Sequence, residues 1–242
     1  MKMSALRHKI SGTRLRFFDV FRRFPVRLRR LVRHLKSGPR SFLTAPRKLN
    51  AALRWWSESL YLALDLAGIP EVYETLLDWI KYKTRPLTGR EIDVARSVFG
   101  DSIQYARVRI DEGAYVGCRH FRFLYVSFYT INAWGAFNDE FLIHELVHVW
   151  QYEKFGGVYI PRAIRAIHSP EGYNYGGVGV LRQAVKTGKS FLDFNYEQQA
   201  DIITDYYRLK TGKRPQWGQA TAADLPVYAH FRDFLTNTPD KV

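Results

Sequence analysis

The spacing of apolar residues predicts three helices between residues 50 and 100. Between residues 50 and 83, apolar side chains recur three and four positions apart, which is typical of helices with one buried face. Gly68-Ile69-Pro70 divides this stretch into two helices. Thr88 and Glu91 have the spacing of a capping box, so a third helix is expected from there to Gly100.

Between residues 103 and 132 the apolar period changes to two, which is typical of strands. Val108 and Ile110 indicate a first strand, and residues 115–118 a second. In residues 120–131 the side chains fall alternately on the two faces of a strand throughout, so this segment predicts one longer strand. We therefore expect a small antiparallel or mixed sheet, and with the helices around it an α+β fold.

The segment between Asn138 and Gly156 is predicted to form a buried helix, and the sequence marks both of its ends. Asn138 is a favourable N-cap, and Asp139 and Glu140 place negative charge in the first turn, where the helix dipole favours it. Gly156 offers a C-terminal stop. Since apolar residues cover most of its circumference, the helix is expected to lie in the core.

Weaker helical patterns follow in the last third of the chain. Residues 161–167 and 180–185 are each expected to form a short helix, with a loop rich in glycine and tyrosine at 169–177 between them. Asn195 followed by Gln198 is an N-terminal capping pair, which predicts a further helix running to about residue 210.

Charge is distributed unevenly along the 242 residues. The net charge is +14, yet residues 1–54 alone hold 16 Lys and Arg against a single acid, Asp19. The rest of the chain is nearly neutral. We therefore predict two parts, a basic N-terminal extension at residues 1–54 and a nearly neutral domain at residues 55–242.

The extension is expected to be helical only in short pieces. Pro25, Gly38-Pro39 and Pro46 interrupt it, and residues 26–36 are a candidate basic amphipathic helix. Such a segment fits a solvated tail, an anionic membrane surface, a secretion apparatus or a transport signal. Nucleic acid is not an expected partner, because no nucleic-acid-binding motif accompanies the charge.

Neither a signal peptide nor a transmembrane helix is recognisable, so the protein is expected to be cytoplasmic as synthesised. The longest apolar run, residues 60–69, is too short to span a bilayer and contains Asp65. Cys118 is the one cysteine, which excludes a disulfide within the chain and a zinc site built from thiolates.

The predicted buried helix carries the residues most indicative of chemistry. Residues 144–148 read His-Glu-Leu-Val-His, the HExxH pattern. Positions i and i+4 lie on one face of a helix, so His144 and His148 can hold one Zn²⁺ ion between them. Glu145 lies beside the metal, where it can act as general base towards a metal-activated water.

A third ligand is expected on the helix that begins at Asn195. Glu197 and Asp201 are four residues apart and share a face. Glu197 can bind the zinc, and Asp201 can accept the remaining ring N–H of a ligating histidine. Two alternatives stay open, namely His168 as third ligand, or Asp201 as direct ligand with Glu197 structural.

Tyr173 and Tyr175, in the glycine-rich loop, are candidate donors to the oxyanion of a transition state. They could equally be aromatic residues that pack on the surface. A metzincin site is excluded, because Gln151 and Lys154 stand where that pattern needs glycine and a third histidine.

HExxH followed on a later helix by Glu-x-x-x-Asp resembles the gluzincin group of zinc metallopeptidases. Glu197 lies 49 residues after His148, a longer gap than in the familiar members, which would reshape the loop between the motifs. Residues 88–209 also resemble bacterial HExxH proteins associated with Vgr and contractile secretion systems.

These resemblances imply a zincin-like fold, zinc-dependent hydrolysis of a peptide or protein substrate, and delivery by a specialised secretion system. The alternative function is a non-catalytic protein with structural zinc that docks on a membrane or a secretion apparatus through residues 1–54. A fourth protein ligand that closes the metal site would favour this alternative.

Overall fold

The chain folds into two compact units that together form an α+β protein, the predicted class. A computed structural model describes residues 3–44, 48–81, 83–115, 118–121 and 123–237. Met1–Tyr82 and Phe155–Pro161 form the first unit, and Lys83–Lys154 with Arg162–Asp240 form the second. The boundary expected after residue 54 falls inside a helix of the first unit, and independent folding of the two predicted parts stays a prediction.

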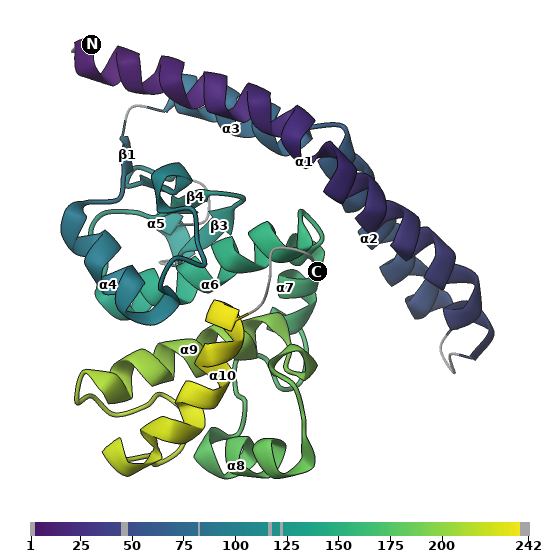
Figure 1. Ribbon diagram of the computed structural model, residues 1–242, viewed down its shortest axis with the longest axis vertical. Helices are drawn as coiled ribbons and strands as arrows, with labels where there is room; N and C mark the ends of the chain where they lie inside the picture. Colours follow the sequence, from purple (N-terminus) through teal and green to yellow (C-terminus); the bar gives the residue numbers. More distant parts are fainter. Residues whose placement is uncertain (1–2, 45–47, 82, 116–117, 122, 238–242) are drawn as a thin grey trace. The chain divides into compact units, whose positions relative to one another are not determined.

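Three helices make up most of the first unit. Helix α1 (Met3–Thr44) runs antiparallel alongside α2 (Lys48–Leu66) and α3 (Ile69–Ile80), as Figure 1 shows. The predicted division between α2 and α3 is confirmed. Gly68 adopts a left-handed conformation with φ of 75°, and Pro70 follows in the first turn of α3, where its missing N–H costs nothing.

Helix α1 is continuous, so the expected division of the extension into short pieces is wrong for residues 3–44. An interior proline such as Pro25 costs about 3 kcal/mol in a helix. On either side of Pro25 the helix is held against α3, because Arg16 pairs with Asp78 at 2.9 Å and Arg27 pairs with Glu71. Pro46 lies outside the described residues.

A four-stranded mixed sheet is found in the second unit, as predicted. The strand order is β1-β2-β4-β3, with β2 and β4 parallel and the outer pairs antiparallel. Each strand has three residues. They are β1 (Thr84–Pro86), β2 (Arg109–Asp111), β3 (Tyr125–Ser127) and β4 (Thr130–Asn132).

The structure differs from the sequence prediction between residues 115 and 132. The expected long strand is a short helix, α5 (Cys118–Phe121), followed by the β3–β4 hairpin. Phe128 reverses the chain with a φ of 59°, and its ring packs on Tyr152 at 5.2 Å. The two-residue alternation of side chains continues through this turn in the sequence. The sequence pattern therefore could not reveal the turn. The strand expected at 115–118 includes residues 116–117, which lie outside the described residues.

The remaining helices supply much of the buried apolar core. The predicted helices are present as α4 (Gly89–Phe99), α6 (Asp139–Phe155), α7 (Tyr159–Ile167), α8 (Gly177–Thr187) and α9 (Tyr196–Lys210). A further helix that the sequence did not reveal, α10 (Leu225–Asn237), packs along α9 (Figure 1).

Helix α6 is buried over most of its length, as its composition predicts. Trp150 is fully buried and its indole N–H donates to the Leu235 carbonyl of α10 at 3.3 Å.

Within the described ranges, no helix is both long enough and apolar enough to cross a bilayer.

Candidate metal centre

Two helices with defined starting points bring the candidate ligands together. The Asn138 side chain accepts from the backbone N–H of Phe141 at 3.0 Å, which fixes the first turn of α6. The start of α9 is set by a complete capping box between Asn195 and Gln198. Glu197 therefore lies in the first turn of α9, facing the middle of α6.

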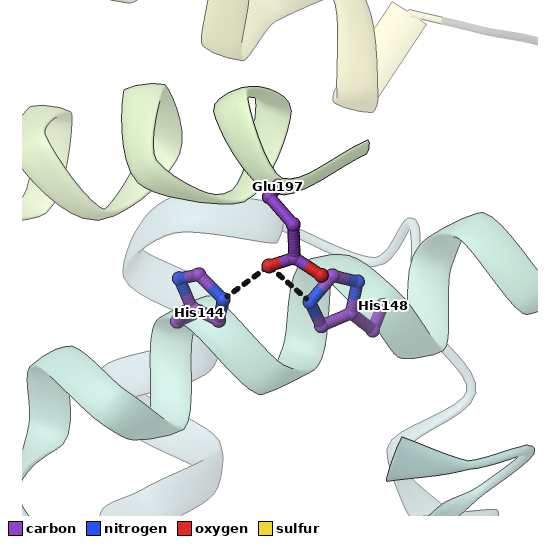
Figure 2. Close-up of side chains that lie close together, drawn as sticks. All are labelled: His144, His148 and Glu197. Carbon is purple, nitrogen blue, oxygen red and sulfur yellow. Dashed lines mark hydrogen bonds and ion pairs between the residues drawn. The ribbon is translucent and has the colours of Figure 1, made fainter. Parts of the chain in front are cut away.

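Glu197 lies between the two histidines (Figure 2). Its Oε2 is 3.2 Å from His144 Nε2 and 3.4 Å from His148 Nε2. The three candidate ligand atoms lie within 4.8 Å of one another. His148 and Glu197 are buried and His144 is half-buried, so this cluster is largely withdrawn from solvent.

Both imidazoles are oriented from behind by a hydrogen bond at Nδ1. His144 Nδ1 lies 2.9 Å from Asp201 Oδ1, and His148 Nδ1 lies 2.8 Å from Gln151 Oε1. The orientation of the Gln151 amide follows from its nitrogen, which donates to the Tyr196 carbonyl. Since both partners accept, each Nδ1 carries a proton, and each Nε2 is turned towards the centre, where it can bind a metal once its own proton has left.

Asp201 is itself fixed by a second donor. The indole N–H of Trp217 donates to Asp201 Oδ2 at 2.6 Å, so the two carboxylate oxygens have different partners. Gln151 is fixed in the same way, because its nitrogen also donates to Gln199 Oε1 at 2.9 Å. The ring planes of both histidines thus depend on residues of α9 or the loop that follows it.

The electrostatics of the cluster favour a cation at its centre. Burial opposes the charged form of His144, but hydrogen bonds to Asp201 and Glu197 raise its pKa well above 6.5. Burial also opposes ionisation of Glu197, but the two histidines lower its pKa to about 2. Glu197 therefore stays ionised, and a metal ion bound there would take the place of protons on the imidazoles.

Glu145 is held close to this cluster without being bonded into it. Its side chain is buried, and its Oε2 has no hydrogen-bond partner among the described residues. Burial raises the pKa of the Glu145 carboxyl, against the opposing effect of His144 and His148. A buried carboxylate with a raised pKa and an unused oxygen is suited to proton transfer.

The two tyrosines of the glycine-rich loop have different surroundings. The Tyr173 ring lies 5.9 Å from that of His144 and is 37% exposed. Burial, reinforced by the charge of Glu197, raises the pKa of Tyr173, so its hydroxyl remains a donor. The Tyr175 hydroxyl instead donates to Asp205 at 2.6 Å and contacts Tyr228, an arrangement that joins the loop to α9 and α10.

His168 does not belong to the cluster that the described residues form. Its Nδ1 lies 2.8 Å from the Ile164 carbonyl of α7, the helix that ends just before it, and its side chain is exposed. Sequence reasoning missed Gln151 and Trp217. The spacing of Gln151, three residues after His148 on the same helix, could have indicated it. Trp217 lies in a loop 16 residues after Asp201, and nothing local marks it.

The donor set fits zinc. Two imidazole nitrogens and one carboxylate oxygen are the ligands that zinc takes in catalytic sites, with a fourth position left for water. Hydrogen bonds behind both histidines are the usual support for such ligands. The unpaired oxygen of Glu145 next to the cluster is also consistent with a site where water is handled.

Comparisons with known proteins give one informative match. No family model matches the chain, and no solved structure matches it. The type VI secretion system spike protein VgrG2b of Pseudomonas aeruginosa is 29% identical over 172 residues, which cover 64% of this chain but only 15% of that protein. The chain thus spans a small part of its relative, and the match fits the expected resemblance to bacterial proteins associated with Vgr.

Proposed function

We propose that this protein is a zinc-dependent hydrolase that cleaves peptide bonds. The convergence of His144, His148 and Glu197 on one point, with Glu145 beside it and unpaired, is the observation that carries the proposal. The resemblance to gluzincin metallopeptidases supports it, because the same residues match both motifs of that group.

Each residue has a distinct task in this proposal. When bound, zinc would polarise the scissile carbonyl and lower the pKa of the attacking water. His144, His148 and Glu197 hold the ion, and Asp201 and Gln151 keep the imidazoles in the required tautomer. Glu145 takes the proton from the attacking water and passes it to the leaving amine. Tyr173, whose ring lies 5.9 Å from that of His144, donates a hydrogen bond to the developing oxyanion.

Association with a secretion apparatus is the second part of the proposal. The similarity to a type VI secretion spike protein supports delivery of this chain by, or as part of, such an apparatus. The same similarity gives more direct support to a second candidate function, in which zinc is structural and the protein has a non-catalytic role on the apparatus. The two candidates differ in whether water reaches the metal.

Cleavage of an unbiased peptide library by the purified, zinc-loaded chain separates these candidates. We expect cleavage that a chelator removes, that added zinc restores, and that Glu145→Gln lacks while still holding zinc. Absence of cleavage by the wild-type chain, combined with full zinc occupancy, would favour the structural role. Equal cleavage by wild type and Glu145→Gln would exclude the proposed chemistry.

A further inference from the structure

The helices of the first unit turn charged side chains towards one another. Arg27 and Glu71 form two hydrogen bonds, one of them 3.1 Å long, and both side chains are buried. Arg16 pairs with Asp78 at 2.9 Å, again with both side chains largely buried. Charged residues are rarely buried unless they are paired, so these ion pairs fix which face of α1 contacts α3.

The apolar residues of α1 consequently lie on its outer surface. They recur at intervals of three or four positions from residue 17 to residue 35 and therefore form one stripe along the helix. Their exposed fractions range from 40% to 65%. The stripe consists of Phe17, Phe21, Phe24, Leu28, Val32 and Leu35.

Basic side chains accompany this stripe, and exposed acids do not. Arg14, Arg29, Arg33 and Lys36 are exposed on α1. Asp19 is the single acidic residue in the sequence of α1, and only 6% of it is exposed. The outer surface of α1 is therefore both apolar and uniformly positive.

We propose that α1 binds the surface of an anionic bilayer, with its apolar stripe inserted among the lipid headgroups. An apolar face flanked by Lys and Arg is the pattern of helices that lie in the membrane interface, where aromatic and aliphatic side chains enter the headgroup region and cations contact lipid phosphates. The salt bridges to α3 hold this face outward without any rearrangement of the helix.

A second copy of the chain fits this surface less well. The stripe has a spacing close to that of a coiled coil, in which residues flanking the seam pair with opposite charges on the partner. Two copies of α1 would bring Arg and Lys against Arg and Lys, and like charges at these positions are destabilising. The charge of the surface is instead complementary to phosphatidylglycerol.

Sedimentation of the full chain with vesicles tests the proposal. We expect binding to vesicles of phosphatidylcholine mixed with phosphatidylglycerol, much weaker binding to phosphatidylcholine alone, and loss of binding as salt is raised. The variant Phe21→Ser with Leu28→Ser keeps the charge unchanged and should bind at least about a hundredfold more weakly, because two apolar side chains no longer enter the lipid.

A matched variant, Phe141→Ser with Leu192→Ser, removes the same two residue types from exposed positions of the second unit and should bind like wild type. Replacing Arg29, Arg33 and Lys36 by Gln should weaken binding roughly fivefold for each charge removed. Thermal unfolding of each variant shows that the fold is kept.

Three outcomes would overturn the proposal. One is wild-type binding that does not depend on phosphatidylglycerol, and another is a stripe variant that is folded and still binds vesicles. The third is sedimentation velocity that shows a dimer which the stripe variant abolishes, without vesicle binding by wild type, since a second copy would then cover the stripe.

Discussion

His144 and Asp201 are joined by a 2.9 Å hydrogen bond between Nδ1 and Oδ1, although 57 residues separate them in the chain. The bond leaves Nε2 of His144 directed at Glu197, 3.2 Å away. Glu197 and Asp201 therefore have different tasks, one at the candidate metal position and the other behind a ligand. Mutation of the two residues should separate these tasks.

Glu197→Gln should yield largely metal-free protein, because it removes one of three ligands. Asp201→Asn should remain metallated at micromolar zinc, with affinity or activity reduced about 10–100-fold, as is typical for loss of a partner behind a ligand. Competition against a chelator of known affinity measures both. If Asp201→Asn loses zinc while Glu197→Gln retains it, Asp201 is the third ligand.

Purified wild-type protein should hold one zinc ion per chain. His148→Ala should lose it, since a ligand atom within 4.8 Å of the other two is removed. Metal analysis after dialysis measures the occupancy. His168→Ala is the matched control, because His168 is exposed and contacts the Ile164 carbonyl of α7, and it should keep full occupancy. Full occupancy in His148→Ala would remove His148 from the site.

Glu145→Gln should keep its zinc and its fold but lose about 10²–10⁴-fold in turnover, the usual contribution of a general base. The substitution preserves size and removes the proton-accepting carboxylate. Single-turnover cleavage of a peptide found in the library measures the effect. Turnover within a factor of two of wild type would show that another group accepts the proton.

Trp217→Phe should weaken zinc binding by about tenfold or less, because it removes one hydrogen bond to the charged Asp201 carboxylate. Combined with Asp201→Asn it should add little, since both changes act through His144. Chelator competition on the two single variants and the double variant measures this coupling. Trp134→Phe, at an exposed tryptophan, serves as control. Additive effects would mean that Trp217 acts independently of Asp201.

Acid should destabilise the second unit partly through Glu91. Burial opposes its ionisation, but hydrogen bonds from Arg85 and Thr88 lower its pKa below 4.5. A group whose pKa is lower in the folded state stabilises above its unfolded pKa, and this contribution disappears as pH falls through the folded value. Glu91→Gln keeps the capping box but removes that dependence.

Urea midpoints of wild type and Glu91→Gln, measured from neutral to acidic pH, test this expectation. The difference between the two proteins should shrink as pH falls below about 4.5. Asp93→Asn, at an exposed acid of the same helix, should follow wild type across the range. A difference that is constant with pH would exclude the ion pair of Glu91 with Arg85 as its source.

Much of the candidate site could be predicted from the sequence, because its parts are local. The HExxH spacing makes chemical sense on a helix, and Asn138 and Gly156 mark the ends of that helix. Asn195 and Gln198 mark the start of α9 in the same way, and this start places Glu197 in its first turn. Capping, helix period and ligand spacing all act within a few residues, so they can be read without a structure.

Tertiary structure decided the features that depend on partners distant in sequence. Pro25 lies within a continuous α1, which ion pairs on both sides of it hold against α3. Phe128 reverses the chain within an unbroken alternating pattern, and Trp217 reaches Asp201 from a loop with no local signal. In each case the deciding energy comes from packing or hydrogen bonding between segments that meet only when the chain is folded, whereas periodicity and capping report local preference alone.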